Sequence, residues 1–118
     1  MANPFVHLEL STPDLSKAKE FYGKLFNWTF TDNDMGGGII YSTFKPDTGP
    51  GGGMVSMPDA KTGWLAYIGV DDINTATTKA TGLGAKVTVG PQEIPNVGWM
   101  TILTDPTGAT IALFQPKT

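Results

Sequence analysis

The side chains best suited to chemistry in this chain lie close together near its start. His7 is the only histidine, and Glu9 follows two residues later. On a β-strand, residues at this spacing project from one face, about 7 Å apart. The imidazole and the carboxylate could exchange protons with a substrate as acid and base, or could orient a ligand without reacting. A hydrogen-bonded histidine with no chemical duty and a solvated glutamate are the plainer alternatives.

A strand followed by a helix must position this pair. From Phe5 to Leu10 the residues alternate, with apolar side chains at Val6, Leu8 and Leu10 on one face. The Thr-Pro-Asp run at 12–14 then predicts a helix, with Thr12 as its N-cap. An apolar stripe along this helix should cover the apolar face of the strand. His7 and Glu9 are therefore expected on the face that points away from the helix.

The chain repeats this pattern 58 residues later. Asp14 and Leu15 correspond to Asp72 and Ile73, and the segment 64–70 corresponds to the first strand. A repeat of this length predicts two copies of one unit, each too small to bury its apolar face alone. We expect a single domain, 1–118, with module one over 1–58 and module two over 59–118.

Each module is expected to have the order β-α-β-β-β. The expected strands and helix starts follow from turn signals and apolar runs. They are strands at 28–30, 39–44 and 54–57, a loop at 46–53, a second helix capped by Asp71 or Asp72, and strands at 85–89, 99–104 and 109–114.

Composition narrows the range of functions. Cysteine is absent, so disulfides and thiolate chemistry are excluded. The net charge is −3 and the eight basic residues are scattered, which argues against a nucleic-acid partner. The chain shows no leader-like start and no apolar run long enough to span a membrane. We therefore expect a cytoplasmic protein with no membrane partner.

Three segments of the second module carry a family resemblance. They are Val-Asp-Asp-Ile at 70–73, Gly-Pro-Gln-Glu-Ile-Pro-Asn-Val-Gly at 90–98 and Asp-Pro-Thr-Gly-Ala at 105–109. With Phe-Tyr at 21–22, they resemble the glyoxalase/bleomycin resistance/dioxygenase superfamily, also called the vicinal oxygen chelate fold. The resemblance implies an α+β fold of two βαβββ modules with pseudo-twofold symmetry, whose curled mixed sheets enclose a cavity. It also implies a small-molecule ligand and a homodimer.

The same resemblance directs attention to a metal site. Members that use a metal place its ligands at positions that correspond here to His7, Met54, Leu65 and Ala112. Leucine and alanine have no lone pair to offer, and a thioether suits only soft metals. We therefore predict no metal and no other cofactor, with a divalent metal on His7 as the weaker alternative.

Two functions are compatible with these residues. The first is a metal-free protein that binds a small, partly apolar or aromatic molecule in the cavity between the modules. The second is a lyase, isomerase or dioxygenase that uses His7 and Glu9 as an acid-base pair or relies on a relocated metal. Strand alternation gives the first ligand contacts, and the resemblance adds an aromatic wall. The predicted contacts are His7, Glu9, Met54, Leu65, Tyr67, Trp99, Ala112 and Phe114.

Overall fold

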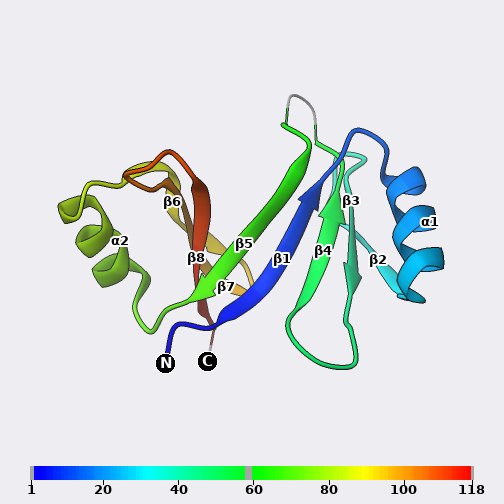
Figure 1. Cartoon of the computed structure of the whole chain (residues 1–118), viewed down its shortest axis with the longest axis horizontal. Coiled ribbons are helices and arrows are strands. Elements are labelled where there is room, and N and C mark those ends of the chain that lie inside the picture. The colour runs from blue at the N-terminus through cyan, green and yellow to red at the C-terminus, as the bar shows by residue number, and fades with distance from the viewer. Residues whose placement is uncertain (1, 58–59, 118) are drawn as a thin grey trace. The chain divides into compact units, whose positions relative to one another are not determined.

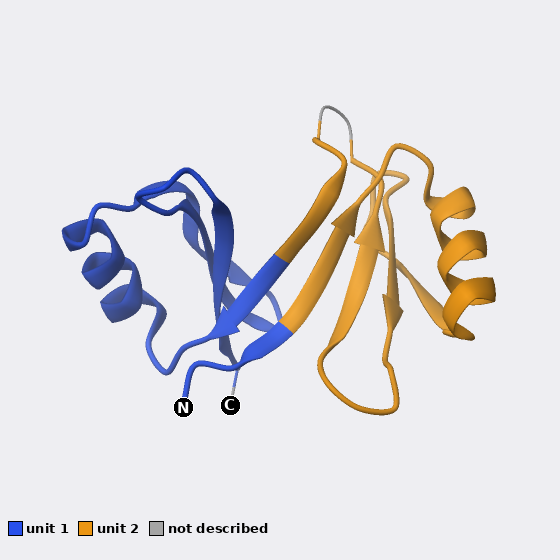
Figure 2. Ribbon diagram, viewed as in Figure 1, with its two compact units in different colours: residues 1–6, 66–118 blue, residues 7–65 orange. Residues whose placement is uncertain are grey.

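The computed structural model describes residues 2–57 and 60–117. The chain divides into two compact units, coloured in Figure 2: unit 2 comprises residues 7–65, and unit 1 comprises residues 1–6 and 66–118. The division passes through the strands β1 (Phe5–Ser11) and β5 (Gly63–Gly69). The predicted module boundary at 58 and 59 lies outside the described residues and stays a prediction.

Unit 2 is a four-stranded mixed sheet with one helix, α1 (Leu15–Phe26), labelled in Figure 1. Its other strands are β2 (Phe30–Asp34), β3 (Ile40–Phe44) and β4 (Gly51–Val55), in the sheet order β2-β3-β4-β1. β1 runs parallel to β4, whereas β3 is antiparallel to both of its neighbours. The predicted β-α-β-β-β order is confirmed here.

Helix α1 begins slightly later than expected. Asp14, not Thr12, is the N-cap, because its backbone is extended and its carboxylate accepts a hydrogen bond from the Lys17 amide at 3.0 Å. The Thr12 hydroxyl instead accepts from the Asp14 amide at 3.2 Å. Asn27 ends the helix in the left-handed conformation, with φ of 58°.

The core of unit 2 lies between the sheet and α1. Leu10, Phe44 and Met54 are buried together, and Trp28 stacks on Phe44 with ring centroids 4.3 Å apart. Leu15, Ala18 and Tyr22 of α1 pack against this cluster, as expected of part of the apolar stripe. The other apolar side chains of the stripe are exposed, namely Phe21, Leu25 and Phe26. The helix-covered face of β1 is therefore the face of Leu10.

Unit 1 repeats the arrangement with β5, helix α2 (Ile73–Gly82), β6 (Lys86–Ile94), β7 (Gly98–Thr104) and β8 (Thr110–Pro116). The sheet order is β5-β8-β7-β6, and β5 is parallel to β8. Asp72 caps α2 by accepting hydrogen bonds from two backbone amides. The α+β class with two βαβββ modules, predicted from the sequence, is confirmed.

Three strands differ from their predicted bounds by three residues or more at one end. β2 spans Phe30–Asp34 rather than 28–30, and β4 includes the glycines 51–53 that were expected in a loop. β6 continues past Val89, with irregular register, through Gly90. A Cβ at Gly90, where φ is 94°, would lie 2.5 Å from the Met100 carbonyl oxygen, so only glycine fits this bend. Among the described residues, no helix is long and apolar enough to cross a membrane.

Helix α2 is attached to its sheet by two buried threonines. The Thr77 hydroxyl donates to the Ile73 carbonyl at 2.7 Å and lies 2.8 Å from the Thr101 hydroxyl on β7. Thr77 has only one hydroxyl proton, so Thr101 must be the donor between the two. The pair therefore has a direction, and its two members are not equivalent.

This direction predicts unequal effects of two similar substitutions. We expect Thr77→Val to cost about 1–3 kcal/mol in unfolding free energy, because it leaves the buried Thr101 donor without its acceptor. Thr101→Val should cost less, since Thr77 keeps its bond to the Ile73 carbonyl. The double variant should be more stable than Thr77→Val alone. Urea unfolding of the three variants measures this, and a larger loss in Thr101→Val would contradict the assigned direction.

Candidate functional site

The predicted pair His7 and Glu9 is joined in unit 2 by a third residue, Tyr41 of β3. The Tyr41 hydroxyl donates to Glu9 Oε1 at 2.8 Å and lies 2.8 Å from His7 Nε2. The rings of His7 and Tyr41 are nearly parallel, at 17°, with centroids 6.3 Å apart. All three side chains are half-buried. The structure thus brings the two predicted residues into one hydrogen-bonded row, which we call the His-Tyr-Glu row.

Tyr41 reaches this row across the intervening strand β4. β4 lies between β3 and β1, and its Gly53 is paired with both Thr43 and Glu9. A Cβ added at Gly53 would lie 2.1 Å from Tyr41 Cε1 and 2.5 Å from its hydroxyl oxygen. The absence of a side chain at Gly53 therefore leaves room for the tyrosine ring to cross the sheet.

The hydrogen bonds of the row fix the direction of each donor. Because the Tyr41 proton is directed to Glu9, the Tyr41 oxygen accepts from His7, and His7 must carry its proton on Nε2. In the neutral ring the lone pair is then on Nδ1. Burial lowers the pKa of His7 below its ordinary value of 6.5, and the nearby Glu9 opposes this shift. His7 is thus a neutral imidazole near pH 7.

The lowered pKa of His7 predicts a pH-dependent stability. Between the lowered pKa and 6.5, the unfolded chain binds a proton that the folded chain does not, so stability rises with pH there. We expect no contribution above about pH 6.5 and a progressive loss on acidification through the lowered pKa. Urea unfolding between about pH 7.5 and pH 5.5 measures the slope.

The matched control for this slope is His7→Gln, which keeps an N–H donor but cannot titrate. Since His7 is the only histidine, the variant should show a flatter pH dependence in this window. An unchanged slope in His7→Gln would show that His7 is not the group responsible.

Met54 does not lie with His7 and Glu9. Its side chain is fully buried in the core cluster on the α1 side of the sheet, beside its register partner Leu10. The correspondence of Met54 with Ala112 assumed a constant offset. Glu9 and Tyr67 are 58 positions apart, but their strand partners Gly53 and Ala112 are 59 apart. The second copy has one more residue than the first between these two strands. A constant offset of 58 therefore matches Ala112 with Met54 instead of Gly53, and Met54 lies on the opposite face of the sheet.

Four of the remaining predicted contacts fall in two groups. Leu65 belongs to unit 2 and is half-buried. In unit 1, Ala112 pairs with Tyr67 and Phe114 lies two residues further along β8, so these three side chains share one face of the sheet. Tyr67 and Ala112 are buried, and Phe114 is half-buried. Alternation had placed Tyr67, and the register now places Phe114 beside it.

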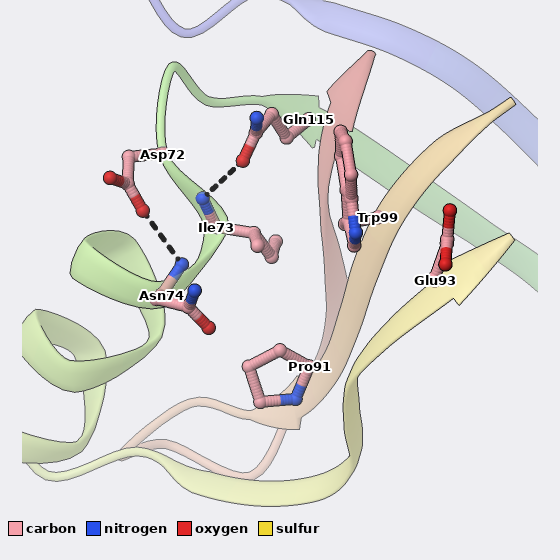
Figure 3. A pocket seen from close by; sticks show the side chains of 7 residues that line it. All are labelled: Asp72, Ile73, Asn74, Pro91, Glu93, Trp99 and Gln115. Carbon is pink, nitrogen blue, oxygen red and sulfur yellow. Dashed lines mark hydrogen bonds between the residues drawn. The ribbon is translucent and has the colours of Figure 1, made fainter. Parts of the chain in front are cut away.

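Trp99 lies on the other face of that sheet. It is two residues from Thr101, which contacts α2, and it pairs with Gln115 and Glu93. Together with the start of α2, these residues line a pocket of ≈ 480 Å³, shown in Figure 3. Trp99 is therefore separate from the aromatic face of Tyr67 and Phe114, on which the family resemblance had placed it.

The donor set does not fit the metal that the family resemblance implies. His7 directs Nε2 to Tyr41, and the equivalent positions in the second module are Leu65 and Ala112, which have no donor atom. Among residues 2–57 and 60–117, no three histidine, aspartate or glutamate side chains are grouped so that they could hold a metal ion. No chemical step is assigned to a metal here.

The sequence places the chain in a known family. Residues 5–113 match the model of the Glyoxalase/Bleomycin resistance protein/Dioxygenase superfamily, so the chain belongs to this superfamily. It is 37% identical over 114 residues to "Putative glyoxylase CFP32" of Mycobacterium tuberculosis, covering 92% of this chain and 44% of that protein. It is 28% identical to "Anthracycline biosynthesis protein DnrV" of Streptomyces peucetius, covering 91% and 45%. The chain thus spans less than half the length of these relatives.

Solved structures support the fold. Methylmalonyl-CoA epimerase from Mycobacterium tuberculosis matches with a TM-score of 0.75 over 98% of this chain and 89% of that protein. The sequence identity is 15%, so this likeness concerns the fold alone.

Proposed function

We propose that the face of unit 2 carrying the His-Tyr-Glu row binds a small, partly apolar or aromatic molecule. The observation that supports this is the row itself. Three polar side chains are held together, half-buried, on the face of the sheet that α1 does not cover. Binding sites combine apolar walls with a few fixed polar groups that orient the ligand. The row supplies those polar groups.

An aromatic ligand suits the rings of the row itself. Tyr41 presents a ring along the sheet, nearly parallel to the imidazole of His7. Burial of apolar ligand area would provide about 25 cal/mol per Å² before the costs of binding. One relative is named for anthracycline biosynthesis, and anthracyclines are polycyclic aromatic compounds. That Leu65, Tyr67, Ala112 and Phe114 also contact the ligand stays a prediction.

We propose that this binding requires no metal ion. A single imidazole, with one nitrogen directed to a tyrosine, is a poor site for a divalent cation, which needs several ligands to offset its dehydration. Elemental analysis of dialysed protein tests this point. Stoichiometric metal that disappears in His7→Ala would contradict it.

The test of ligand binding uses Tyr41→Phe, which keeps the ring over Gly53 and removes only the hydroxyl. Doxorubicin serves as the aromatic probe, because its own fluorescence reports binding. We expect the variant to bind doxorubicin about 3- to 10-fold more weakly, because His7 and Glu9 lose the hydroxyl that fixes their orientation.

The matched control is Tyr22→Phe. Tyr22 is also half-buried in unit 2 and accepts a hydrogen bond from Trp64 Nε1 at 3.3 Å, but it lies on α1. The Tyr22→Phe variant should therefore bind doxorubicin as the unmodified protein does. Equal binding by both variants, or no binding by the unmodified protein, would contradict the proposal for this ligand class.

Proton transfer is a second candidate function, because the hydrogen-bond donors and acceptors of the row are ordered as in a catalytic relay. If Nδ1 of His7 took a proton from a substrate, the imidazolium would donate through Tyr41 toward the Glu9 carboxylate. Isomerase or lyase chemistry of this kind consists of proton transfers that a positioned acid-base pair can carry out.

Turnover of the methylglyoxal–glutathione hemithioacetal tests this second function. Activity in the unmodified protein that falls about 100-fold or more in His7→Gln would favour proton transfer over binding alone. Absence of turnover, or turnover that survives the substitution, would leave binding as the function of the row.

We also propose that the protein is a homodimer. This rests on the family resemblance, and sedimentation equilibrium tests it directly. A mass that remains at the 12.5 kDa of a single chain at high protein concentration would rule out the dimer.

A further inference from the structure

We infer that the pocket at the start of α2 is a second binding site, which takes a small organic ammonium ion. The pocket is an open hollow of ≈ 480 Å³, a volume suited to a small molecule. Its lining combines carboxylate, amide and aromatic groups from α2 and three strand-borne segments of unit 1 (Figure 3). The lining residues are Asp72, Ile73, Asn74, Pro91, Glu93, Trp99 and Gln115.

One wall of the pocket already binds a cation that belongs to the chain. The ammonium group of Lys117 lies 5.2 Å from the centroid of the Trp99 ring and 2.6 Å from Glu93 Oε2. An aromatic face together with a carboxylate is the combination that recognises alkylammonium ions. Glu93 and Trp99 are register partners on adjacent strands, so the sheet itself fixes their spacing.

The opposite wall adds negative charge and no basic group. Asp72 has one carboxylate oxygen that accepts hydrogen bonds from the amides of Asn74 and Thr75, which holds the side chain at the rim. Gln115 is held by the bond between its Oε1 and the Ile73 amide at 2.8 Å. Two carboxylates therefore face the pocket, and the basic group on its wall, Lys117, is the cation that a ligand would replace.

Lys117 can leave this wall without disturbing the fold. Its backbone amide is bonded to the Val97 carbonyl at 3.0 Å, so the chain stays in place when the side chain moves. The ion pair with Glu93 is exposed, with 40% and 51% of the two side chains accessible, and such pairs contribute little to stability. A ligand's ammonium group can thus replace that of Lys117 on Trp99 and Glu93.

This site is independent of the proposed function. It lies on the α2 side of the sheet in unit 1, whereas the His-Tyr-Glu row belongs to unit 2. The two sites differ in the chemistry of their residues, and each can be altered without changing the other.

The experiment compares choline with 3,3-dimethyl-1-butanol, which has the same shape without the charge. Heteronuclear NMR follows the indole N–H signal of Trp99, assigned by its loss in Trp99→Phe, in buffer of constant ionic strength. We expect choline to shift this signal with a roughly millimolar dissociation constant, and the neutral alcohol to leave it unchanged.

Substitutions then separate the cation site from a general effect. Lys117→Met removes the competing ammonium group and should tighten choline binding about threefold. Glu93→Gln, which is exposed and should not affect folding, should weaken it by a similar factor. Tyr41→Phe should leave choline binding unchanged, which distinguishes this site from the His-Tyr-Glu row.

Three results would overturn the inference. They are equal shifts with choline and with the neutral alcohol, choline binding that is unchanged by both Lys117→Met and Glu93→Gln, and no shift up to about 50 mM choline even in Lys117→Met, where the competing cation–π contact is absent.

Discussion

Substituting Gly53 with alanine is expected to destabilise unit 2 and to disrupt the His-Tyr-Glu row at the same time. The new methyl group would lie 2.1 Å from Tyr41 Cε1, well inside van der Waals contact, so the ring must leave its place over β4. Overpacking of this kind costs about 1–3 kcal/mol in unfolding free energy. Urea unfolding should show that loss, and doxorubicin binding should fall at least as far as in Tyr41→Phe.

The cause of the loss can be separated from any general effect of replacing glycine. A Cβ added at Gly82, at the end of α2, would have nothing within 4 Å, so Gly82→Ala should be neutral or slightly stabilising. The clash also predicts a coupling between two residues. In a Tyr41→Ala background, Gly53→Ala should cost almost nothing, because the ring that it displaces is absent. An equal cost in both backgrounds would show that the contact with Tyr41 is not the reason.

Most of the fold follows from local signals in the sequence. The alternation in β1, the caps of the two helices and the 58-residue repeat together determine the β-α-β-β-β order of each half. The errors in the bounds of β4 and β6 fall where glycine enters the sheet. Residues 51–53 read as a loop because glycine weakens strand propensity, yet here the neighbouring Tyr41 and Phe44 rings need the space that a side chain would fill.

For a related reason, the sequence predicted His7 and Glu9 as part of the candidate site but not Tyr41. His7 and Glu9 share a face through the alternation of a single strand, which sequence spacing determines. Tyr41 lies on β3, which is two strands away from β1 in the sheet order. Its place in the row therefore depends on the register between the strands. Trp99 depends on register in the same way, and the family resemblance placed it on the wrong face. The sequence thus predicts the face of a residue when alternation along a single strand determines that face. It does not predict which residues meet when this depends on the pairing between strands.

The strand register also shows that Met54 and Ala112 do not occupy equivalent positions, although a constant repeat period had made them equivalent. A repeat of constant period assigns Met54 the role of Ala112, but Ala112 pairs with Tyr67 just as Gly53 pairs with Glu9. A shift of one residue moves every side chain of a strand to the other face. Gly53 therefore occupies the position that corresponds to Ala112, and Met54 supports the sheet from behind.

Replacing Met54 with alanine is therefore expected to act on stability and not on ligand contacts. Met54 is 0% exposed and lies in one cluster with Leu10 and Phe44. Removing its side chain should leave a cavity and cost about 2–5 kcal/mol in unfolding free energy, measured by urea denaturation. For a domain of this size, that loss is a large fraction of the total stability.

Met54→Leu is the control, because it keeps the volume and apolar character of the side chain. It should cost less than about 1.5 kcal/mol, and the folded variant should bind doxorubicin as the unmodified protein does. A ligand contact would behave in the opposite way, with little change in stability and weaker binding in both variants. Such a result would return Met54 to the face of His7 and Glu9. The expected result instead makes Met54 part of the packing that holds β4 in register, and so part of what keeps Gly53 beneath the Tyr41 ring.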